Sequence, residues 1–340
     1  MTAPKNRQLL LKSRPEGMID ESNFEVVESP VPVIGDGELL VKVHYVSIDP
    51  GMRGWLRPHR TYVDPVPLGD VMRALSLGQV IESRRAGFEA GEFVVGWLGI
   101  QDYAVTRGEG LHKADPALAP LPAWLNALGM PGLTAYFGLL KIGAARPGDT
   151  VLISAAAGAV GSLVGQIGQL MDCRTIGLAG SAEKCAWLTD ELGFDAAINY
   201  RESKDLAADI KGAAPDGVDI YYDNVGGEIL DAALMTLNQG ARVVVCGMIS
   251  QYNNTGPGYG VRNTLSLLRN RARMEGFIVF DFKDQFDEAY PRLGRWVRAG
   301  KLHHREDLTR GIENAAAAMK RMFTGENFGK SVLEISPPAL

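Results

Sequence analysis

The feature that most constrains this chain is a series of short, almost wholly apolar segments in its second half. They lie at residues 150–156, 174–180, 196–200, 218–226 and 242–250, and residues 273–282 could add one more. Between them lie stretches able to form helices, such as VGSLVGQIGQLM and AEKCAWLTDEL. Strands that lack polar alternation need cover on both faces, as in a parallel sheet between two layers of helices. The sequence therefore predicts an α/β fold with a doubly wound parallel sheet.

The first of these segments runs directly into a glycine-rich turn and then into a helix. The turn matches the dinucleotide fingerprint G-x-G-x-x-G, with Ala156 in place of the first glycine. Gly158 lets the backbone approach a pyrophosphate, and Gly161 permits close packing of helix on strand. Ala159 and Val160 lie between them, where free helical N–H groups attract phosphate. Such turns also occur for packing alone, but the strand before and the helix after favour a nucleotide site.

The end of the second strand distinguishes NADP from NAD. An NAD enzyme usually carries an Asp or Glu there to bind the ribose 2′-OH, whereas this chain has Gly180. Ser181 offers a hydroxyl, and Lys184 places a positive charge at the start of the next helix. Taken alone, Lys184 would be a solvated surface lysine. With the acid missing, the pattern favours a clamp for the 2′-phosphate of NADP.

The first third of the chain is rich in short strands. Residues 39–48 alternate apolar and polar side chains, and residues 91–99 and 101–106 are strand-like runs interrupted by glycine. This spacing predicts a compact barrel or sandwich. The pattern changes to alternating helices and strands between Pro116 and Pro122.

The C-terminal segment is expected to return to the first domain. Helices are predicted near residues 286–298 and 309–323, followed by a last strand in KSVLEI. The first domain would then comprise residues 1–122 and 300–340, and the nucleotide domain residues 123–299.

Motifs along nearly the whole chain resemble those of the zinc-free medium-chain dehydrogenase/reductases. The chain is similar to the leukotriene B4 12-hydroxydehydrogenase / 15-oxoprostaglandin 13-reductase group and to bacterial curcumin-reductase-like enzymes. The matching stretches are NRQLLLKSRPEGM, DP-x-MRG, GMPGLTAYFGLL, AAAGAVGS, GSAEK, INY, YYDNVGG, CGMISQYN, MEGFIV and ENFGK. One position departs from the pattern, because Gly51 stands where many relatives carry tyrosine. Trp55 or Tyr62 could fill part of that space.

The resemblance implies a GroES-like β-barrel domain for the substrate and a Rossmann domain for NADPH. Lys184 and Tyr200 would hold the 2′-phosphate. Phe277 and Val279 would flank the nicotinamide, and Thr134 would pack beside its ring. Asn327 would reach the cofactor from the C-terminal segment. The full cofactor set so implied is Thr134, Gly158, Ala159, Val160, Gly161, Ser181, Lys184, Tyr200, Asn224, Cys246, Gly247, Ser250, Tyr252, Phe277, Ile278, Val279 and Asn327.

The cysteines argue against a metal site. Zinc relatives hold their metal with Cys and His from the barrel domain, but Cys173, Cys185 and Cys246 all lie in the nucleotide domain and the five histidines are scattered. Without a Lewis acid, hydride transfer favours an electrophilic substrate such as an α,β-unsaturated ketone or aldehyde. Its carbonyl oxygen would become an enolate and need hydrogen-bond donors. The cofactor ribose 2′-OH and the phenol of Tyr252 are the predicted donors, although a buried core tyrosine is the alternative for Tyr252.

Other functions are compatible with the same motifs. An NADPH quinone oxidoreductase would use the same fold, and a non-catalytic NADPH-binding sensor or structural protein could keep it. The net charge of −5 gives no indication of a nucleic-acid or membrane partner. The absence of a long apolar run indicates a cytoplasmic protein. The apolar RMEGFIVFDF would form an exposed edge strand in a monomer, which predicts a homodimer.

Overall fold

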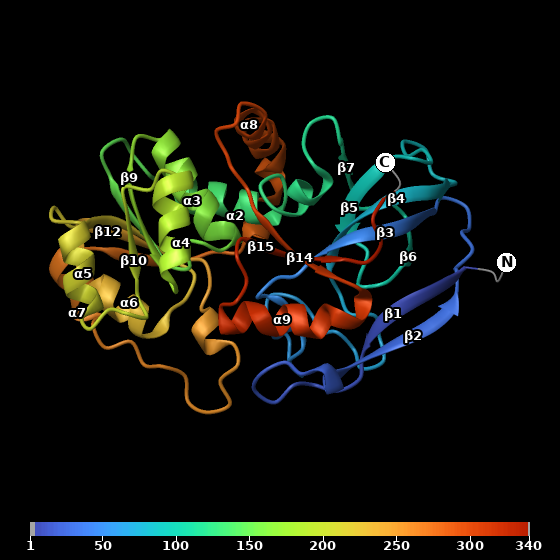
Figure 1. Cartoon of the computed structure of the whole chain (residues 1–340), viewed down its shortest axis with the longest axis horizontal. Coiled ribbons are helices and arrows are strands. Elements are labelled where there is room, and N and C mark those ends of the chain that lie inside the picture. Colours follow the sequence, from blue (N-terminus) through green and yellow to red (C-terminus); the bar gives the residue numbers. More distant parts are fainter. Residues whose placement is uncertain (1–3, 339–340) are drawn as a thin grey trace. The chain divides into compact units, whose positions relative to one another are not determined.

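The computed structural model describes residues 4–338, and the chain folds into two compact units. One unit comprises Met1–Leu125 and Glu306–Leu340, and the other comprises Asn126–Arg305. Figure 1 shows the helices and strands of both units. The boundaries predicted from the sequence follow residues 122 and 299, whereas the units divide after Leu125 and Arg305. No helix within residues 4–338 is long and apolar enough to cross a bilayer.

The second unit contains a six-stranded parallel sheet in the order β10-β9-β8-β11-β12-β13. The first strand in the chain, β8, lies in the middle beside β11, so the chain winds outward in both directions from this point. This is the strand order of a Rossmann sheet, and the predicted doubly wound fold is confirmed. The strands are β8 (Thr150–Ile153), β9 (Arg174–Ala179), β10 (Ala196–Asn199), β11 (Val218–Asp223), β12 (Leu237–Val245) and β13 (Arg273–Gly276).

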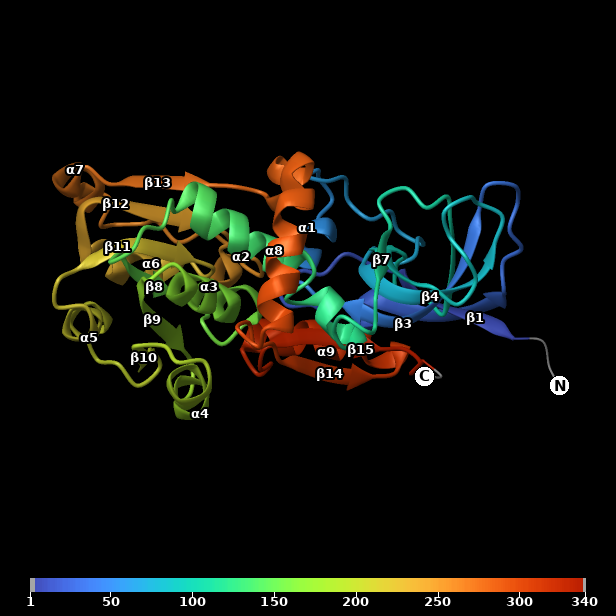
Figure 2. The same cartoon turned by 90° about the horizontal axis from the view of Figure 1, so that it is seen from above.

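Helices cover both faces of this sheet, as two neighbouring tyrosines of β11 illustrate. Tyr221 packs in a buried cluster with Ile210 of α5 and Leu230 of α6, whereas the Tyr222 hydroxyl donates to the carbonyl of Thr134 in α2 at 2.8 Å. Successive side chains of a strand point to opposite faces, so α2 and the α5–α6 pair lie on opposite sides. Figure 2 shows α8 beside α2. The helices are α2 (Met130–Phe137), α3 (Ala159–Leu170), α4 (Ala182–Ala186), α5 (Leu206–Ala213), α6 (Gly227–Leu234), α7 (Leu265–Asn270) and α8 (Phe286–Arg298).

The last strand of this sheet is shorter than the sequence predicts. β13 ends at Gly276, and a 3-10 helix occupies Val279–Gln285 where residues 273–282 were expected to form one strand. Phe282 packs against Phe277 at 6.3 Å between ring centroids and stacks on Phe137 of α2 at 4.8 Å. These ring contacts fold the chain back onto α2, so it leaves the sheet after four residues.

The first unit is built on antiparallel strands. A seven-stranded sheet runs β14-β15-β3-β4-β5-β7, with β6 also paired to β3, and β1 and β2 form a separate two-stranded sheet. Its strands are β1 (Lys5–Leu11), β2 (Phe24–Pro30), β3 (Leu39–Ser47), β4 (Leu75–Ser83), β5 (Phe93–Trp97), β6 (Tyr103–Thr106), β7 (His112–Ala114), β14 (Glu306–Arg310) and β15 (Lys330–Glu334).

The C-terminal segment contributes two strands to that sheet. The expected helix over residues 309–323 begins only at Ala315, as α9 (Ala315–Thr324). Residues Glu306–Arg310 instead pair in parallel with β15, and Gly311 ends that strand with φ of 87°. The parallel pairing of β14 extends the sheet by one strand. It places residues 309 and 310, the start of the predicted helix, in that strand.

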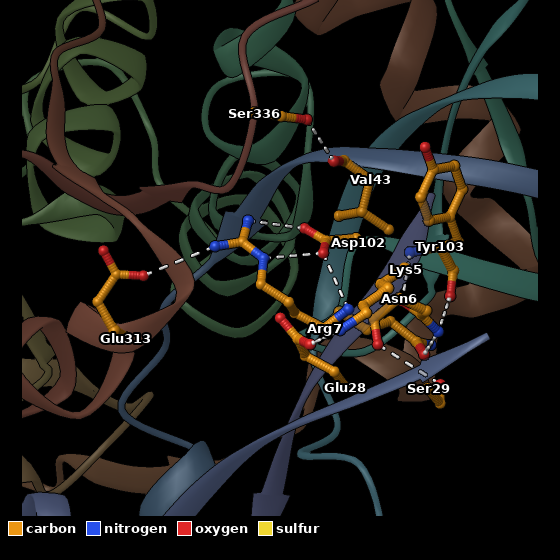
Figure 3. Close-up of polar contacts among 11 residues, drawn as sticks. Lys5, Asn6, Arg7, Glu28, Ser29, Val43, Asp102, Tyr103, Glu313 and Ser336 are labelled. Atoms are coloured by element: carbon orange, nitrogen blue, oxygen red, sulfur yellow. Dashed lines mark hydrogen bonds and ion pairs between the residues drawn. The ribbon is translucent and has the colours of Figure 1, made fainter. Parts of the chain in front are cut away.

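An ion-pair network anchors β1 within the first unit (Figure 3). The Arg7 guanidinium donates to both carboxylate oxygens of Asp102, at 2.9 and 3.0 Å, and lies 3.9 Å from Glu313. The bidentate contact with Asp102 raises the pKa of Arg7. Asn6 adds a bond from its side-chain amide to the carbonyl of Tyr103 at 3.0 Å. The network therefore joins the two-stranded sheet to the loop before β6 and to the C-terminal segment.

Candidate functional site

The glycine-rich turn after β8 brings α3 unusually close to the strand. Ala155 adopts a left-handed φ of 48°, which ends the strand earlier than the predicted residue 156. Gly158 caps α3 in an extended conformation. A Cβ at Gly161 would lie 2.8 Å from the Cα of Ala156 and would also clash with the carbonyl of Ala155. Only glycine allows this approach, and it exposes the N–H groups of the first turn, around Ala159 and Val160, for an anion such as a pyrophosphate.

Gly180 takes the place of a carboxylate at the end of β9, where polar and basic groups gather. A Cβ at Gly180 would lie 3.1 Å from the Tyr200 hydroxyl and 3.3 Å from Nε of Arg201, both of which follow the neighbouring strand β10. Ser181 caps α4 by accepting the N–H of Lys184 at 3.2 Å. Arg201 was not among the predicted residues, although its place directly after Tyr200 at a strand end could have indicated it. The charge and the hydroxyls suit a 2′-phosphate.

Hydrogen bonds that are partly buried join the ends of β8 and β11. The Asn224 N–H donates to Oγ of Ser154 at 2.8 Å, and its side-chain amide donates to the Ser154 carbonyl at 2.7 Å. One carboxylate oxygen of buried Asp223 accepts from Tyr221 at 2.8 Å and from the N–H of Gly226 at 2.9 Å. Burial raises the pKa of Asp223, and these hydrogen bonds oppose that shift. Ser154 and Asp223 were not predicted; their signal is a polar residue at the end of an apolar strand.

The segment after β12 places Tyr252 at the same edge of the sheet. The N–H groups of Cys246 and Gly247 donate to the Asp223 carbonyl at 2.9 and 3.1 Å. The Tyr252 hydroxyl accepts the N–H of Met248 at 3.2 Å, and a Cβ at Gly247 would lie 3.2 Å from it. The phenol therefore lies at the carboxyl end of β12, where ligands of open α/β sheets bind.

The remaining predicted residues divide between the two units. Ser250 is exposed and donates to the Val225 carbonyl at 2.6 Å. The Phe277 ring lies close to Gly138, the residue that follows α2, the helix of Thr134. A Cβ at Gly138 would lie 2.7 Å from the Phe277 ring and would also clash with the Tyr222 hydroxyl. Ile278 and Val279 follow, half-buried.

Asn327 belongs to the first unit, where its amide donates to the Gly329 carbonyl at 3.1 Å. Its predicted contact with a cofactor stays a prediction, as do the cofactor contacts of the other predicted residues.

Two of the three cysteines lack the character of nucleophiles. Burial raises the pKa of the Cys173 thiol to about 11 and that of Cys246 to about 12, so both stay protonated. Within the part of the chain that the structure describes, no group of three or more His, Cys, Asp or Glu side chains is arranged to hold a metal ion.

Comparison with known proteins defines the class. A family model described as "N-terminal domain of oxidoreductase" matches residues 7–114, and one described as "Zinc-binding dehydrogenase" matches residues 159–295. With the Rossmann sheet and its glycine-rich turn, these matches and the relatives below show that the chain belongs to the medium-chain dehydrogenase/reductase family.

Individual relatives show to which group of this family the chain belongs. The NADPH-dependent curcumin reductase of Escherichia coli (strain K12) is 41% identical over 338 residues, covering 98% of this chain and 97% of that protein. The NADP(+)-dependent 2-alkenal reductase of Nicotiana tabacum is 39% identical over 337 residues, covering 97% and 98%. The crystal structure of CurA from Vibrio vulnificus in complex with NADPH matches with a TM-score of 0.92 at 41% identity, covering 98% of this chain and 100% of that one. The chain is thus a member of the zinc-free, curcumin-reductase-like group, and the predicted family is confirmed.

Proposed function

We propose that this chain reduces the activated carbon–carbon double bond of α,β-unsaturated ketones and aldehydes with NADPH as the reductant. The observation that carries the proposal is the Tyr252 hydroxyl, held at the carboxyl end of β12 by the N–H of Met248. Relatives named for the reduction of curcumin and of 2-alkenals support it.

Residues of the second unit would hold the cofactor. The first turn of α3 at Gly158–Gly161 suits the pyrophosphate, and Lys184, Tyr200 and Arg201 suit the 2′-phosphate. The proposed cofactor set is completed by Asn224, Cys246 and the segment after it, Thr134, residues 277–279 and Asn327. When bound, NADPH supplies the hydride that adds to the β-carbon of the substrate.

Tyr252 would stabilise the charge that this addition creates. Negative charge collects on the carbonyl oxygen as the enolate forms, and a donor placed there lowers the barrier. The Met248 N–H donates to the phenol oxygen and so fixes its position. A hydrogen bond received by a hydroxyl also strengthens the one it donates. The α-carbon would then take its proton from water.

A substrate panel tests this function. NADPH oxidation is followed with benzylideneacetone, cyclohexenone, hexenal and benzoquinone. We expect higher kcat/KM for the enones and the enal than for the quinone. Turnover of the quinone alone would identify a quinone oxidoreductase, and NADPH binding without turnover of any of them would indicate a non-catalytic protein.

A homodimer in the cytoplasm is part of the same proposal. β13 is an edge strand whose four residues are all exposed, and Met274 in it and Leu265 and Leu268 of α7, the preceding helix, are exposed apolar side chains. Edge strands with apolar neighbours invite pairing across a two-fold axis. Three free cysteines suit a reducing compartment. Light scattering that gives one chain's mass at micromolar concentration would reject the dimer.

A further inference from the structure

Residues 252–264 lead from the 3-10 helix at Ile249–Gln251 to α7 and form neither helix nor strand. Residues 254–258 are exposed, and a Cβ at Gly256 or Gly260 would meet no atom within 4 Å. A segment rich in Gly and Asn with few packing contacts needs specific bonds to stay ordered. Tyr252, the proposed donor to the substrate, is its first residue. The bonds that order this segment therefore matter for the position of Tyr252.

Asp231 of α6 binds the far end of this segment. One oxygen of its carboxylate accepts the Tyr259 hydroxyl at 2.7 Å, and the other accepts the N–H groups of Arg262 and Asn263, both at 2.9 Å. The Asn263 side-chain amide also donates to the Asp231 carbonyl at 3.0 Å. Val261, which lies between these residues, packs against the buried cluster to which α6 contributes. The segment is therefore docked on α6 where it approaches α7.

The Asp231 carboxylate keeps its charge although the residue is only 6% exposed. Burial works against ionisation, but the bonds from Asn263, Tyr259 and Arg262 outweigh it and lower the pKa of Asp231. Hydrogen bonds to a charged acceptor are roughly twice as strong as neutral ones. The bond to this carboxylate raises the pKa of Tyr259, so the hydroxyl stays a donor. The Arg262 guanidinium adds a contact over the Tyr259 ring, 5.4 Å from its centroid.

Gln251 joins the docked end of the segment to the residue beside Tyr252. Its side-chain oxygen accepts the Tyr259 N–H at 2.8 Å and the Asn254 side-chain amide at 3.0 Å. Tyr259 thus bonds Asp231 through its hydroxyl and Gln251 through its backbone. These two bonds close the segment at its base, next to Tyr252 in the chain.

We propose that Asp231 is a positioning residue that holds Tyr252 in place for the reaction. It acts through Tyr259 and Gln251, and this role requires no contact of its own with substrate or cofactor. The phenol of Tyr252 must lie where charge develops on the substrate oxygen, so a small displacement of its backbone lowers the turnover number. This inference rests on the proposed function, which makes Tyr252 the donor.

The kinetic experiment compares Asp231→Ala and Tyr259→Phe with the wild type, using benzylideneacetone and NADPH. Asp231→Ala releases all three donors, whereas Tyr259→Phe removes one bond and keeps the test valid if the first variant fails to fold. We expect kcat to fall about threefold to tenfold for Asp231→Ala, the range given by the loss of up to one hydrogen bond. Tyr259→Phe should lower kcat less, and KM for NADPH should stay unchanged in both. In a Tyr252→Phe background, Tyr259→Phe should have no further effect, because the two residues act as a unit.

Asp205→Ala is the matched control in the same unit. The Asp205 carboxylate caps α5 by accepting the Ala208 N–H at 3.0 Å, so its loss should cost about 1 kcal/mol of stability. The bonds that close residues 252–264 remain in this variant. It should therefore lower Tm and leave kcat unchanged. A fall in kcat as large as that of Asp231→Ala would show that lost stability, and not the position of Tyr252, lowers turnover.

NMR of the protein with 13C-labelled tyrosine follows Tyr252 without turnover, and its signal is assigned by its absence from Tyr252→Phe. We expect Asp231→Ala to shift or broaden this signal and to speed amide hydrogen exchange in residues 252–262. If no enone is turned over but the signal changes in this way, the reductase function fails and the placement of Tyr252 by Asp231 stands. An unchanged signal would overturn that placement. In an active enzyme, an unchanged kcat for Asp231→Ala or additive losses in the double variant of Tyr252 and Tyr259 would overturn the proposal as well.

Discussion

The two units of this protein place their candidate site residues in different ways. In the second unit, the candidate site is formed mainly by backbone groups and glycines at the ends of β8, β9, β11 and β12. The close approach of α3 to the turn after β8 at Gly161 is an example. In the first unit, side chains from separate loops meet, as Tyr62 does with Trp55 beside Gly51. A region built from backbone follows from a local motif, whereas one built from distant side chains depends on packing.

The largest expected effect concerns the buried charge that supports the Gly51 loop. Lys330 is 1% exposed, and its ammonium group donates to Asp49 at 3.1 Å and to the Ser331 carbonyl at 2.9 Å. Lys330→Ala leaves Asp49 without its buried partner and should lower the free energy of unfolding by about 3–5 kcal/mol. Urea denaturation measures this.

An exposed lysine in the same unit provides the control. Lys113 pairs with Glu92 at 2.6 Å on the surface, so Lys113→Ala should cost less than about 1 kcal/mol. Similar small losses for both variants would show that side-chain contacts matter less in the first unit than the comparison requires.

The next effect tests the backbone-built site. Gly161→Ala should lower the free energy of unfolding by about 1–3 kcal/mol through overpacking against Ala156, and should weaken NADPH binding. At Gly212 in α5, an added Cβ would meet no atom within 4 Å, so Gly212→Ala should raise stability, on the order of 0.5 kcal/mol. If Gly161→Ala is as stable as Gly212→Ala and binds NADPH equally well, the glycine-rich turn after β8 does not bind the cofactor pyrophosphate.

Tyr252 is the side chain that carries the proposed chemistry of the second unit. Tyr252→Phe should lower kcat by about tenfold or more while the protein still folds and binds NADPH. The loss should stay below the 10²- to 10³-fold typical of an oxyanion donor, because the cofactor ribose hydroxyl remains. Full turnover with a lower Tm would instead show that the phenol serves only to bind the Met248 N–H.

The smallest effect concerns cofactor choice. Lys184→Ala should raise the KM for NADPH about tenfold, the worth of one charge-assisted hydrogen bond, and leave that for NADH unchanged. Arg201→Ala should do the same to a lesser degree, because Arg201 is exposed and its charge is screened. Equal changes for both cofactors would remove these residues from the phosphate site.

The sequence predicted the second unit better than the first for the same physical reason. Apolar strands, a glycine-rich turn and the amphipathic pattern of residues 286–298 are local, so the parallel sheet and α8 could be placed from them. The early end of β13 depends instead on Phe282 stacking on distant Phe137. Arg201 was missed because its approach to Gly180 arises from the pairing of β9 with β10. The sequence offered Trp55 or Tyr62 to fill the space at Gly51, and both lie there, but which of them comes closer depends on tertiary packing.

The most direct test of the central claim follows the hydride itself. The protein is given benzylideneacetone and NADPH that carries deuterium at the transferable position of the nicotinamide, and the product is examined by NMR. The account predicts a saturated ketone, benzylacetone, with deuterium on its β-carbon. Deuterium on the former carbonyl carbon, in an allylic alcohol, would contradict it, because the enzyme would then reduce the carbonyl and not the double bond.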